Sequence, residues 1–391
     1  MRRVFIWLGH LLLLVVVTLI AIFAFAPAYV DKGRNRVADI VLPAISEEAA
    51  ALHADLLIGD WHADPTLWKR DLNDRSDRGH VDIPRLIEGN VALQVFTAVT
   101  KSPAGQNIDA NTAEAFDNIT PLAIGQLWPM RTWGSLFERA SYQAEKLHRT
   151  AAQSGGTFRI ITTQTELDQL LADRTAGQKV VGGIIGIEGA HALEADVTNL
   201  DRLEAQGLRL VGLHHFFDNG LGGSLHGFSN AGLTDFGKEI VQEVSARGMI
   251  LDVAHSSPAV VRDVIAMTDM PIVLSHGGIF SHCSTARNLS DALMQEIAST
   301  GGVIGIGFWK SASCDITPDG VAASIKAAVD IMGEDHVALG SDFDGSVQTG
   351  FDSANLAVLT DAMIRAGLTE SQIRKIAGQN MLRVLRERLP D

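Results

Sequence analysis

Eight short apolar runs, rich in β-branched residues, constrain the fold of this chain more than any other feature of its sequence. The runs are residues 56–61, 91–99, 180–187, 208–213, 249–253, 271–274, 302–308 and 337–339. They lack polar alternation, which is typical of strands that are buried on both faces. Helical segments lie between most of them. Strands that alternate with helices predict a parallel sheet, and eight repeats predict an α/β fold of the closed (β/α)₈ barrel type.

Helix signals and one long connection refine this prediction. Helices are expected at residues 235–247, 291–299 and 370–387, each directly after a Ser or Thr that could cap it. The last of these contains Gly378, where we expect an interruption. The connection over residues 101–179 is too long for one crossover, so it predicts an insertion with a long helix at 133–152.

Histidine or carboxylate residues lie at or just after the ends of six of the eight runs. They are His62, Asp64, Glu188, His214, His215, Asp252, His255, His276, Asp342 and Asp344. The C-terminal ends of barrel strands meet at one mouth, so these side chains should converge there. Nitrogen and oxygen ligands without thiolate suit zinc, manganese and other divalent first-row ions. The number of candidate ligands exceeds one tetrahedral site and favours two ions that share a carboxylate, as in metallohydrolases.

Each of these residues has an alternative interpretation when taken alone. His62 and Asp64 could reach one metal from the same face of a strand, or they could simply end that strand. Glu188 follows an apolar run and is costly to bury unpaired, so a salt bridge to Arg or Lys is the alternative to metal binding. The metallohydrolase prediction therefore depends on the set of residues and not on any one of them.

The composition excludes other classes of protein. The 391 residues carry a formal net charge of −14, which disfavours binding to the phosphate backbone of nucleic acids. Hydrophobic residues make up 46% and charged residues 20%, as in globular and not in disordered chains. Cys283 and Cys314 are the only cysteines, too few for a disulfide framework or a Cys-rich zinc site. We expect two unpaired thiols, with a single bridge between them as the alternative.

The N-terminal segment does not belong to the predicted barrel. An uncharged apolar run spans residues 4–26 and follows Arg2 and Arg3. A membrane-spanning helix needs about 20 apolar residues and a signal-peptide core only about 7–15. We therefore predict a membrane anchor in residues 1–30, although residues 24–28 resemble a signal cleavage site and leave a cleaved signal as the alternative.

A short linker, residues 31–50, should join this anchor to a barrel domain over residues 51–391. Basic residues lie on both sides of the apolar run, so the positive-inside rule barely decides the orientation. We expect a membrane-anchored protein whose catalytic domain is periplasmic or extracellular.

From about residue 55 to 389, the chain resembles the membrane dipeptidase (renal dipeptidase) family, peptidase family M19. The motifs that carry the resemblance are His62-Ala63-Asp64, Glu188-Gly189, Leu213-His214-His215, Leu233-Thr234-Asp235-Phe236-Gly237, Leu251-Asp252-Val253-Ala254-His255, Ser275-His276, Arg287-Asn288 and Gly340-Ser341-Asp342-Phe343-Asp344-Gly345. Their order and spacing are shared throughout. The chain looks closest to the bacterial members with an N-terminal anchor.

The resemblance implies a dinuclear zinc dipeptidase and a role for each site residue. His62 and Asp64 would bind one zinc ion, His255 and His276 the other, and Glu188 would bridge the two. His215 would contact the substrate near the scissile carbonyl. Arg287 would hold the substrate's terminal carboxylate, for which a structural salt bridge is the alternative. Asp342, and not Asp344, would be the catalytic acid/base.

This assignment is chemically consistent. Two cations can polarise the amide carbonyl and lower the pKa of a bridging water to near 7, so that the hydroxide attacks. His215 would stabilise the developing oxyanion, and Asp342 would move the water's proton to the leaving amine. The family also implies tolerance of a D-residue at the C-terminal position, and it suggests a homodimer. His214 replaces a usual Thr, and Gly277 and Gly278 also depart from the family pattern, which leaves the preferred dipeptide open.

Two other functions compete with this one. Amidohydrolase-like barrels that act on another amide or on a lactone commonly begin with His-x-His and use a bridging lysine, whereas this chain has His62-x-Asp64 and Glu188. A binding protein on the same scaffold would not need an intact set of ligands. The remaining histidines are expected at the surface or in packing: His53, His80, His148, His191, His226, His282 and His336. Trp61, Trp68 and Phe216 are expected to shape the pocket or to pack in the core.

Overall fold

The computed structural model describes residues 2–391, and at its centre eight parallel strands close into a barrel. The barrel strands are β2 (Ile58–Ala63), β3 (Val91–Val99), β5 (Val181–Glu188), β6 (Leu208–Gly212), β7 (Ile250–Asp252), β8 (Val273–Gly277), β9 (Val303–Ile306) and β10 (Val337–Leu339). The ring closes where Leu339 of β10 pairs with Asp60 of β2. Each of the eight predicted runs overlaps one of these strands, so the predicted (β/α)₈ barrel is confirmed.

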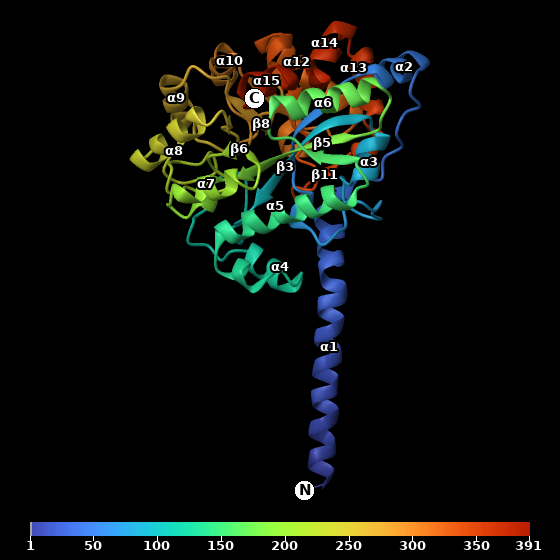
Figure 1. Cartoon of the computed structure of the whole chain (residues 1–391), viewed down its shortest axis with the longest axis vertical. Coiled ribbons are helices and arrows are strands. Elements are labelled where there is room, and N and C mark those ends of the chain that lie inside the picture. Colours follow the sequence, from blue (N-terminus) through green and yellow to red (C-terminus); the bar gives the residue numbers. More distant parts are fainter. Residues whose placement is uncertain (1) are drawn as a thin grey trace.

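Helices cover the outside of the barrel (Figure 1). They are α2 (Glu47–Asp55), α3 (Ile83–Glu88), α5 (Leu136–Gln153), α6 (Gln164–Thr175), α7 (Thr198–Glu204), α8 (Asp235–Ala246), α9 (Pro258–Met267), α10 (Asp291–Ser299), α11 (Lys310–Ser313), α12 (Pro318–Met332), α13 (Ala357–Arg365), α14 (Glu370–Arg374) and α15 (Asn380–Arg388). The predicted caps are present, since the hydroxyls of Thr234, Ser290 and Thr369 accept backbone N–H groups from the first turns of α8, α10 and α14. A π-helical turn, Lys375–Gln379, separates α14 from α15 at the predicted interruption. A side chain at Gly378 would collide with the backbone of Leu57.

The insertion between β3 and β5 contains more structure than the one long helix predicted. It holds α4 (Ile119–Gly125), a 3₁₀ turn (Met130–Trp133), α5, the short strand β4 (Phe158–Ile160) and α6. The long helix begins at Leu136 and not at residue 133, because Ser135 caps it by accepting the N–H of Glu138. Strand β4 lies outside the ring. It pairs with residues 181–183 of β5, and β6 pairs with residues 185–187 on the same edge of β5.

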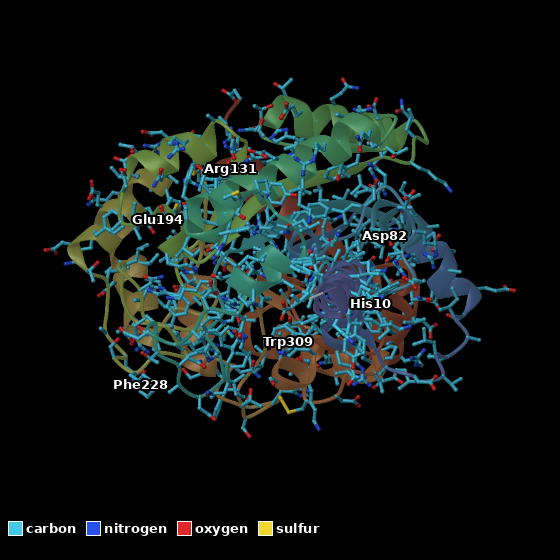
Figure 2. The ribbon with its side chains drawn as sticks, turned by 90° about the horizontal axis from the view of Figure 1, so that it is seen from below. His10, Asp82, Arg131, Glu194, Phe228 and Trp309 are labelled. Carbon is cyan, nitrogen blue, oxygen red and sulfur yellow. A yellow bond between two sulfur atoms is a disulfide. The ribbon has the colours of Figure 1, made fainter. Side chains whose placement is uncertain are left out.

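The N-terminal residues form one long helix, α1 (Arg2–Arg34), that projects away from the barrel (Figure 1). Its segment from Phe5 onward is long and apolar enough to cross a membrane. Figure 2 looks along this helix from below and shows it end-on beside the barrel, with His10 marking its exposed part. The helix is thus consistent in length and composition with the predicted anchor.

The C-terminal end of α1 is fixed to the domain by buried polar contacts. The carboxylate of Asp31 is buried and lies 3.1 Å from the guanidinium of Arg70. The amide oxygen of Asn35 accepts the N–H of Ser346 at 3.0 Å. Directly after it, β1 (Arg36–Val37) pairs in parallel with β11 (Gln348–Thr349). The segment predicted as a linker therefore begins with residues that belong to the folded domain.

Asp344 lies on the other side of Arg70, with 2.8 Å between its carboxylate and the guanidinium. The backbone N–H groups of His80 and Val81 donate to the same carboxylate. Replacing Asp344 by asparagine should lower the free energy of unfolding by about 3 kcal/mol, the lower end for breaking a buried pair, because Asp31 still pairs with Arg70. Thermal and denaturant unfolding of the full chain measure this loss.

The control and the pH dependence sharpen that prediction. Asp335→Asn removes an exposed carboxylate beside Lys375 and should change stability by less than about 1 kcal/mol. Although burial alone raises it, Arg70 and His80 hold the pKa of Asp344 well below its usual range. The contribution of ionised Asp344 to the free energy of unfolding is therefore complete above about pH 4 and is lost as the pH falls further. If the Asp344→Asn variant lost as much stability as the wild type when the pH falls below about 4, the ion pair of Asp344 with Arg70 would not be the source of that stability.

Candidate metal centre

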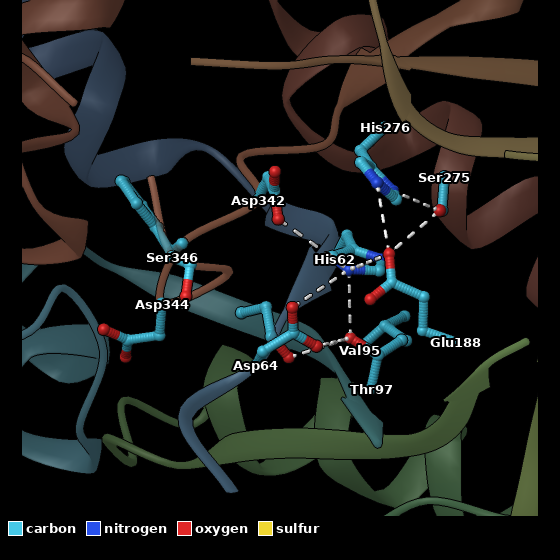
Figure 3. A network of polar contacts seen from close by, with 12 residues as sticks. His62, Asp64, Val95, Thr97, Glu188, Ser275, His276, Asp342, Asp344 and Ser346 are labelled. Carbon is cyan, nitrogen blue, oxygen red and sulfur yellow. Dashed lines mark hydrogen bonds and ion pairs between the residues drawn. The ribbon is translucent and has the colours of Figure 1, made fainter. Parts of the chain in front are cut away.

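The predicted site residues meet at the C-terminal mouth of the barrel. His62 lies near the end of β2, Glu188 is the last residue of β5, and His276 is near the end of β8. Asp64, His215, His255 and Asp342 follow β2, β6, β7 and β10 within a few residues. All seven side chains are buried, and Figure 3 shows how four of them surround His62. The expected convergence of the strand ends is therefore present.

Glu188 lies at the centre of this cluster. Its Oε1 is 3.2 Å from Nε2 of His255, 3.4 Å from Nε2 of His276 and 3.5 Å from Nε2 of His62. Its Oε2 is 3.2 Å from Nε2 of His215. One carboxylate thus contacts four imidazoles, which come from four different strand ends. None of these partners is the Lys or Arg of the alternative salt bridge.

The candidate ligand atoms form three overlapping groups, one of which joins His62, His276 and Asp342. Nε2 of His62 lies 3.4 Å from a carboxylate oxygen of Asp64. The Nε2 atoms of His255 and His276 are 2.9 Å apart. The ligand atoms of His62, Asp64 and Glu188 all lie within 4.8 Å of one another, and so do those of Glu188, His215 and His255. Glu188 belongs to both of these last groups, which is the arrangement expected of a shared ligand.

The electrostatics of the cluster suit cations. Although burial alone lowers it, the carboxylates of Asp64, Glu188 and Asp342 raise the pKa of His62 to about 10. Burial and the neighbouring Asp64 raise the pKa of Glu188 well above its usual value. Three buried carboxylates therefore face a place where positive charge is favourable. The residues present fit divalent ions with nitrogen and oxygen ligands.

Hydrogen bonds behind the ligands orient them for such ions. The hydroxyl of Ser275 donates to Asp252 at 2.6 Å and lies 2.8 Å from Nδ1 of His276. Because that hydroxyl already donates, it accepts from Nδ1–H, and Nε2 of His276 keeps its lone pair free toward Glu188. Thr97 similarly donates to Asp64 at 2.5 Å. The sequence did not single out Thr97, since a threonine within a strand is common and carries no signal.

His215 is held by its other ring nitrogen. Nδ1 lies 3.2 Å from the carbonyl oxygen of Lys101, so Nδ1 carries a proton and donates it there. Burial lowers the pKa of His215 to about 4. The Nε2 atom, which faces the cluster, therefore carries a proton only when the ring is doubly protonated. A nearby negative charge would favour that form.

Arg287 reaches the same cavity from the segment between β8 and α10. Its Nη2 donates to the carbonyl oxygen of His276 at 2.7 Å, and its guanidinium lies over the ring of Trp309. Among residues 2–391, the ion pairs of the nearby carboxylates of Glu188 and Asp342 are all with histidines and not with Arg287. The structural salt bridge, which was the alternative role for Arg287, is therefore not formed in the described chain. A cation without a carboxylate partner lines the cavity.

The structure separates the two aspartates that follow β10. Asp342 Oδ1 lies 4.0 Å from Nε2 of His62, and burial raises the pKa of Asp342 to about 8. Asp344 points away from the cluster (Figure 3), and its carboxylate pairs with Arg70. The backbone at both positions is left-handed, with φ of 58° and 66°, a conformation that Asp and Asn tolerate better than most residues. Of the two, only Asp342 belongs to the cluster.

A cavity of about 760 Å³ opens above the cluster. Glu188, His215, Arg287 and Asp342 line its floor, together with Trp68, Phe216 and Trp309. Trp68 and Phe216 thus shape the pocket, whereas Trp61 is fully buried in the core below. The histidines expected in packing or at the surface join none of the possible metal-ligating groups found in the described residues.

Cys283 and Cys314 form a disulfide, with 5.5 Å between their Cα atoms. The expectation of two unpaired thiols is therefore wrong. Sequence separation alone could not reveal the pairing, because it depends on α11 folding back against the segment that carries Arg287. The bridge holds that segment beside the cavity.

Comparisons with known proteins agree with this geometry. The family model described as membrane dipeptidase (peptidase family M19) matches residues 46–389. An uncharacterized protein in the pqqA 5′ region of Klebsiella pneumoniae is 30% identical over 256 residues, 61% of this chain and 92% of that protein. The solved structure of dipeptidase AC, a metallopeptidase of family M19, is 26% identical with a TM-score of 0.68 and covers 86% of this chain and 99% of that one. A metallopeptidase from Rhodobacter sphaeroides, solved with a phosphinate mimic of L-Ala-D-Ala, is 27% identical with a TM-score of 0.66 and covers 85% and 99%.

Proposed function

Because this chain belongs to the membrane dipeptidase family, peptidase family M19, we propose that it hydrolyses the peptide bond of dipeptides with two zinc ions. His62 and Asp64 would hold one ion, His255 and His276 the other, and Glu188 both. The observation that carries the proposal is the position of Glu188 within 3.5 Å of imidazoles from both groups. When bound, the two ions would polarise the scissile carbonyl and activate a water molecule.

The chain's own residues would move the protons. Asp342 lines the cavity beside His62, where its carboxylate could accept a proton from the attacking water. The same group, once protonated, could deliver that proton to the leaving amine. His215 faces the cavity through Nε2 and would donate to the carbonyl oxygen in its doubly protonated form, as negative charge develops there.

Arg287 would bind the carboxylate of the substrate. Its planar guanidinium is buried, has no acidic partner among the described residues and borders the cavity. A bidentate pair with a carboxylate would compensate for the burial of that charge. The cavity has room beyond a small dipeptide, and the Rhodobacter sphaeroides relative holds a mimic of a dipeptide with a C-terminal D-residue. We therefore include L,D-dipeptides among the substrates.

Arg287→Ala should weaken the hydrolysis of free dipeptides far more than that of dipeptide amides. A charged hydrogen bond to the carboxylate is worth about 1.5–3 kcal/mol, so kcat/KM for free dipeptides should fall roughly ten- to a hundredfold. Steady-state kinetics on a matched pair of substrates measures the difference. Arg262→Ala removes an exposed arginine that pairs with Glu296 and serves as the control. Equal losses on both substrates would make Arg287 a structural residue.

A turnover screen over L,L- and L,D-dipeptides with added zinc tests the proposed activity. Chelation should stop hydrolysis, and zinc should restore it. N-acyl amides and lactones belong in the same screen, because another amidohydrolase-like activity is the competing function. Faster turnover of those substrates than of any dipeptide would overturn the proposal.

We also propose that α1 anchors the protein in a membrane and that the barrel lies in the periplasm or outside the cell. Disulfides persist in oxidising compartments, and Cys283–Cys314 is one. Resistance of the full chain to extraction at alkaline pH tests the anchor. Access of a non-permeant protease to the barrel in intact cells tests the orientation. The homodimer implied by the family is part of the proposal, and sedimentation of the protein in detergent tests it.

A further inference from the structure

The last turns of α1 form one wall of the catalytic cavity. Ala26, Pro27 and Val30 line the same cavity as Glu188 and Arg287. Ile119, Pro121 and Leu122 of α4 also line it, and α4 packs against α1. The cavity is therefore bordered by both α1 and α4. Both helices lie on the side of the domain from which α1 projects (Figure 1).

The position of α1 relative to the barrel is set by the contacts of its C-terminal end. Asp31 and Arg70 form a buried ion pair, and Asn35 bonds to the loop after β10. The pairing of β1 with β11 follows within two residues. These contacts fix the helix to the domain directly after the residues of α1 that line the cavity. The barrel cannot turn away from whatever surrounds α1 without breaking them.

The apolar run of α1 ends at the level of the cavity. Residues 4–26 give a helix of about 34 Å at 1.5 Å per residue, close to the roughly 30 Å of a bilayer's hydrocarbon core. If this run spans the core, Ala26 and Pro27 lie at the bilayer surface. Because both residues line the catalytic cavity, its opening lies at that surface too.

Exposed apolar side chains flank α4 in the chain, and α4 itself lines the cavity. Phe116 is 66% exposed, Leu127 61% and Met130 76%, and Trp133 is also exposed. Among the described residues after residue 45, the other large apolar side chains exposed to this degree are Phe228 and Phe280. Leu127 also has a left-handed backbone with φ of 59°, which is uncommon for a bulky residue. We call Phe116, Leu127, Met130 and Trp133 the α4 surface.

We propose that the α4 surface inserts into the interfacial layer of the bilayer that holds α1, so that the catalytic cavity opens among the lipid headgroups. The inference rests on the anchoring role of α1 given above. Exposed aromatic and large apolar side chains beside a membrane-spanning helix are typical of contacts with that layer. The four residues flank α4 in the chain, and α4 contacts α1 directly, so the bilayer around α1 is within their reach.

Site-specific fluorescence in the full chain tests this. Leu127→Cys and Met130→Cys each supply one reactive thiol, since the native cysteines form a disulfide. The control is Ser371→Cys on α14, an exposed position at the far end of the domain from α1 (Figure 1). Each variant carries a polarity-sensitive dye and is reconstituted into phosphatidylcholine–phosphatidylglycerol vesicles. Iodide quenches from water and a nitroxide-labelled lipid quenches from the bilayer.

The lipid-borne quencher should dim the dyes at 127 and 130 by about half or more, because interfacial apolar groups lie about 5–10 Å deep, and iodide should hardly affect them. The dye at 371 should respond only to iodide. Equal iodide quenching at all three positions, in vesicles that carry the protein by flotation, would overturn the inference. So would protection from both quenchers at 127 and 130, which would mean that a protein surface covers them.

Two further readouts separate this inference from the proposed function. Failure of the protein to float with the vesicles would overturn both the anchor and the inference. Dipeptide turnover in the same vesicles reports on the catalytic site alone, because neither Leu127 nor Met130 lines the cavity. Active, floating protein with water-exposed dyes at 127 and 130 would therefore contradict only the docking of the α4 surface.

Discussion

Replacing Glu188 by glutamine is expected to release both metal ions and to stop dipeptide hydrolysis. Glutamine keeps the shape but loses the charge that lies between His62 on one side and His255 on the other. Loss of a residue that only supports a ligand already costs about 10- to 100-fold in metal affinity, and the loss of a shared ligand should cost more. Metal content after gel filtration of the full chain measures this directly.

The control for this experiment is Glu296→Gln, which removes an exposed carboxylate that pairs with Arg262. It should keep its metal and its activity. Metal content of the Glu188 variant reduced by half would mean that Glu188 serves only one ion. Full metal content would mean that Glu188 is no ligand, and the two-ion proposal would fail.

Asp342→Asn should lower kcat by about 10²–10⁴-fold, the usual contribution of a general base. Binding of substrate should change much less, because asparagine keeps the shape. Asparagine also tolerates the left-handed backbone at this position, where φ is 58°. The five proposed ligands are untouched, so the metal content should stay the same. Measurements of kcat, KM and metal content on one preparation test all three expectations.

The pH dependence of kcat adds a second test of Asp342. Without metal, burial raises the pKa of its carboxyl to about 8. Two neighbouring cations would lower that pKa and leave the group ionised at neutral pH, ready to accept a proton. The acid limb of the pH–rate profile should therefore lie below neutrality in the zinc-loaded enzyme and should vanish in Asp342→Asn.

Asp344 is the internal comparison for Asp342. It lies two residues further on but binds Arg70 and the backbone of His80. Asp344→Asn should lose stability and yet keep most of its kcat in the folded protein, measured well below the unfolding temperature. If Asp344→Asn stopped turnover with fold and metals intact, while Asp342→Asn did not, the catalytic carboxylate would be misassigned.

The barrel could be predicted from the sequence because its strands are buried on both faces. Such strands are continuous apolar runs, and each of the eight runs overlaps one barrel strand. The candidate ligands could be predicted for a related reason. A histidine or carboxylate directly after an apolar run has to lie at the strand's end, and all strand ends of a barrel face one mouth.

Features that depend on distant contacts could not be predicted. Residues 158–160 form β4 only because β5 offers them an edge. The pairing of β1 with β11 joins residues more than three hundred positions apart, and no local pattern marks it. Trp61 and Trp68 looked equivalent in the sequence, but Trp61 faces the core and Trp68 the cavity. Trp61 lies in β2, whereas Trp68 follows the 3₁₀ turn after that strand, and only the folded chain fixes where each ring points.

The attachment of α1 to the barrel limits how far this enzyme can reach. A flexible chain over residues 31–50 would let a catalytic domain wander about 25 Å from its anchor. Here the ion pair of Asp31 and the strand β1 join the helix to the barrel at once. With α1 in a bilayer, the active site would stay at the level of the lipid headgroups. Because the active site could not move away from the membrane, peptides in solution would be hydrolysed only after they diffuse to its surface.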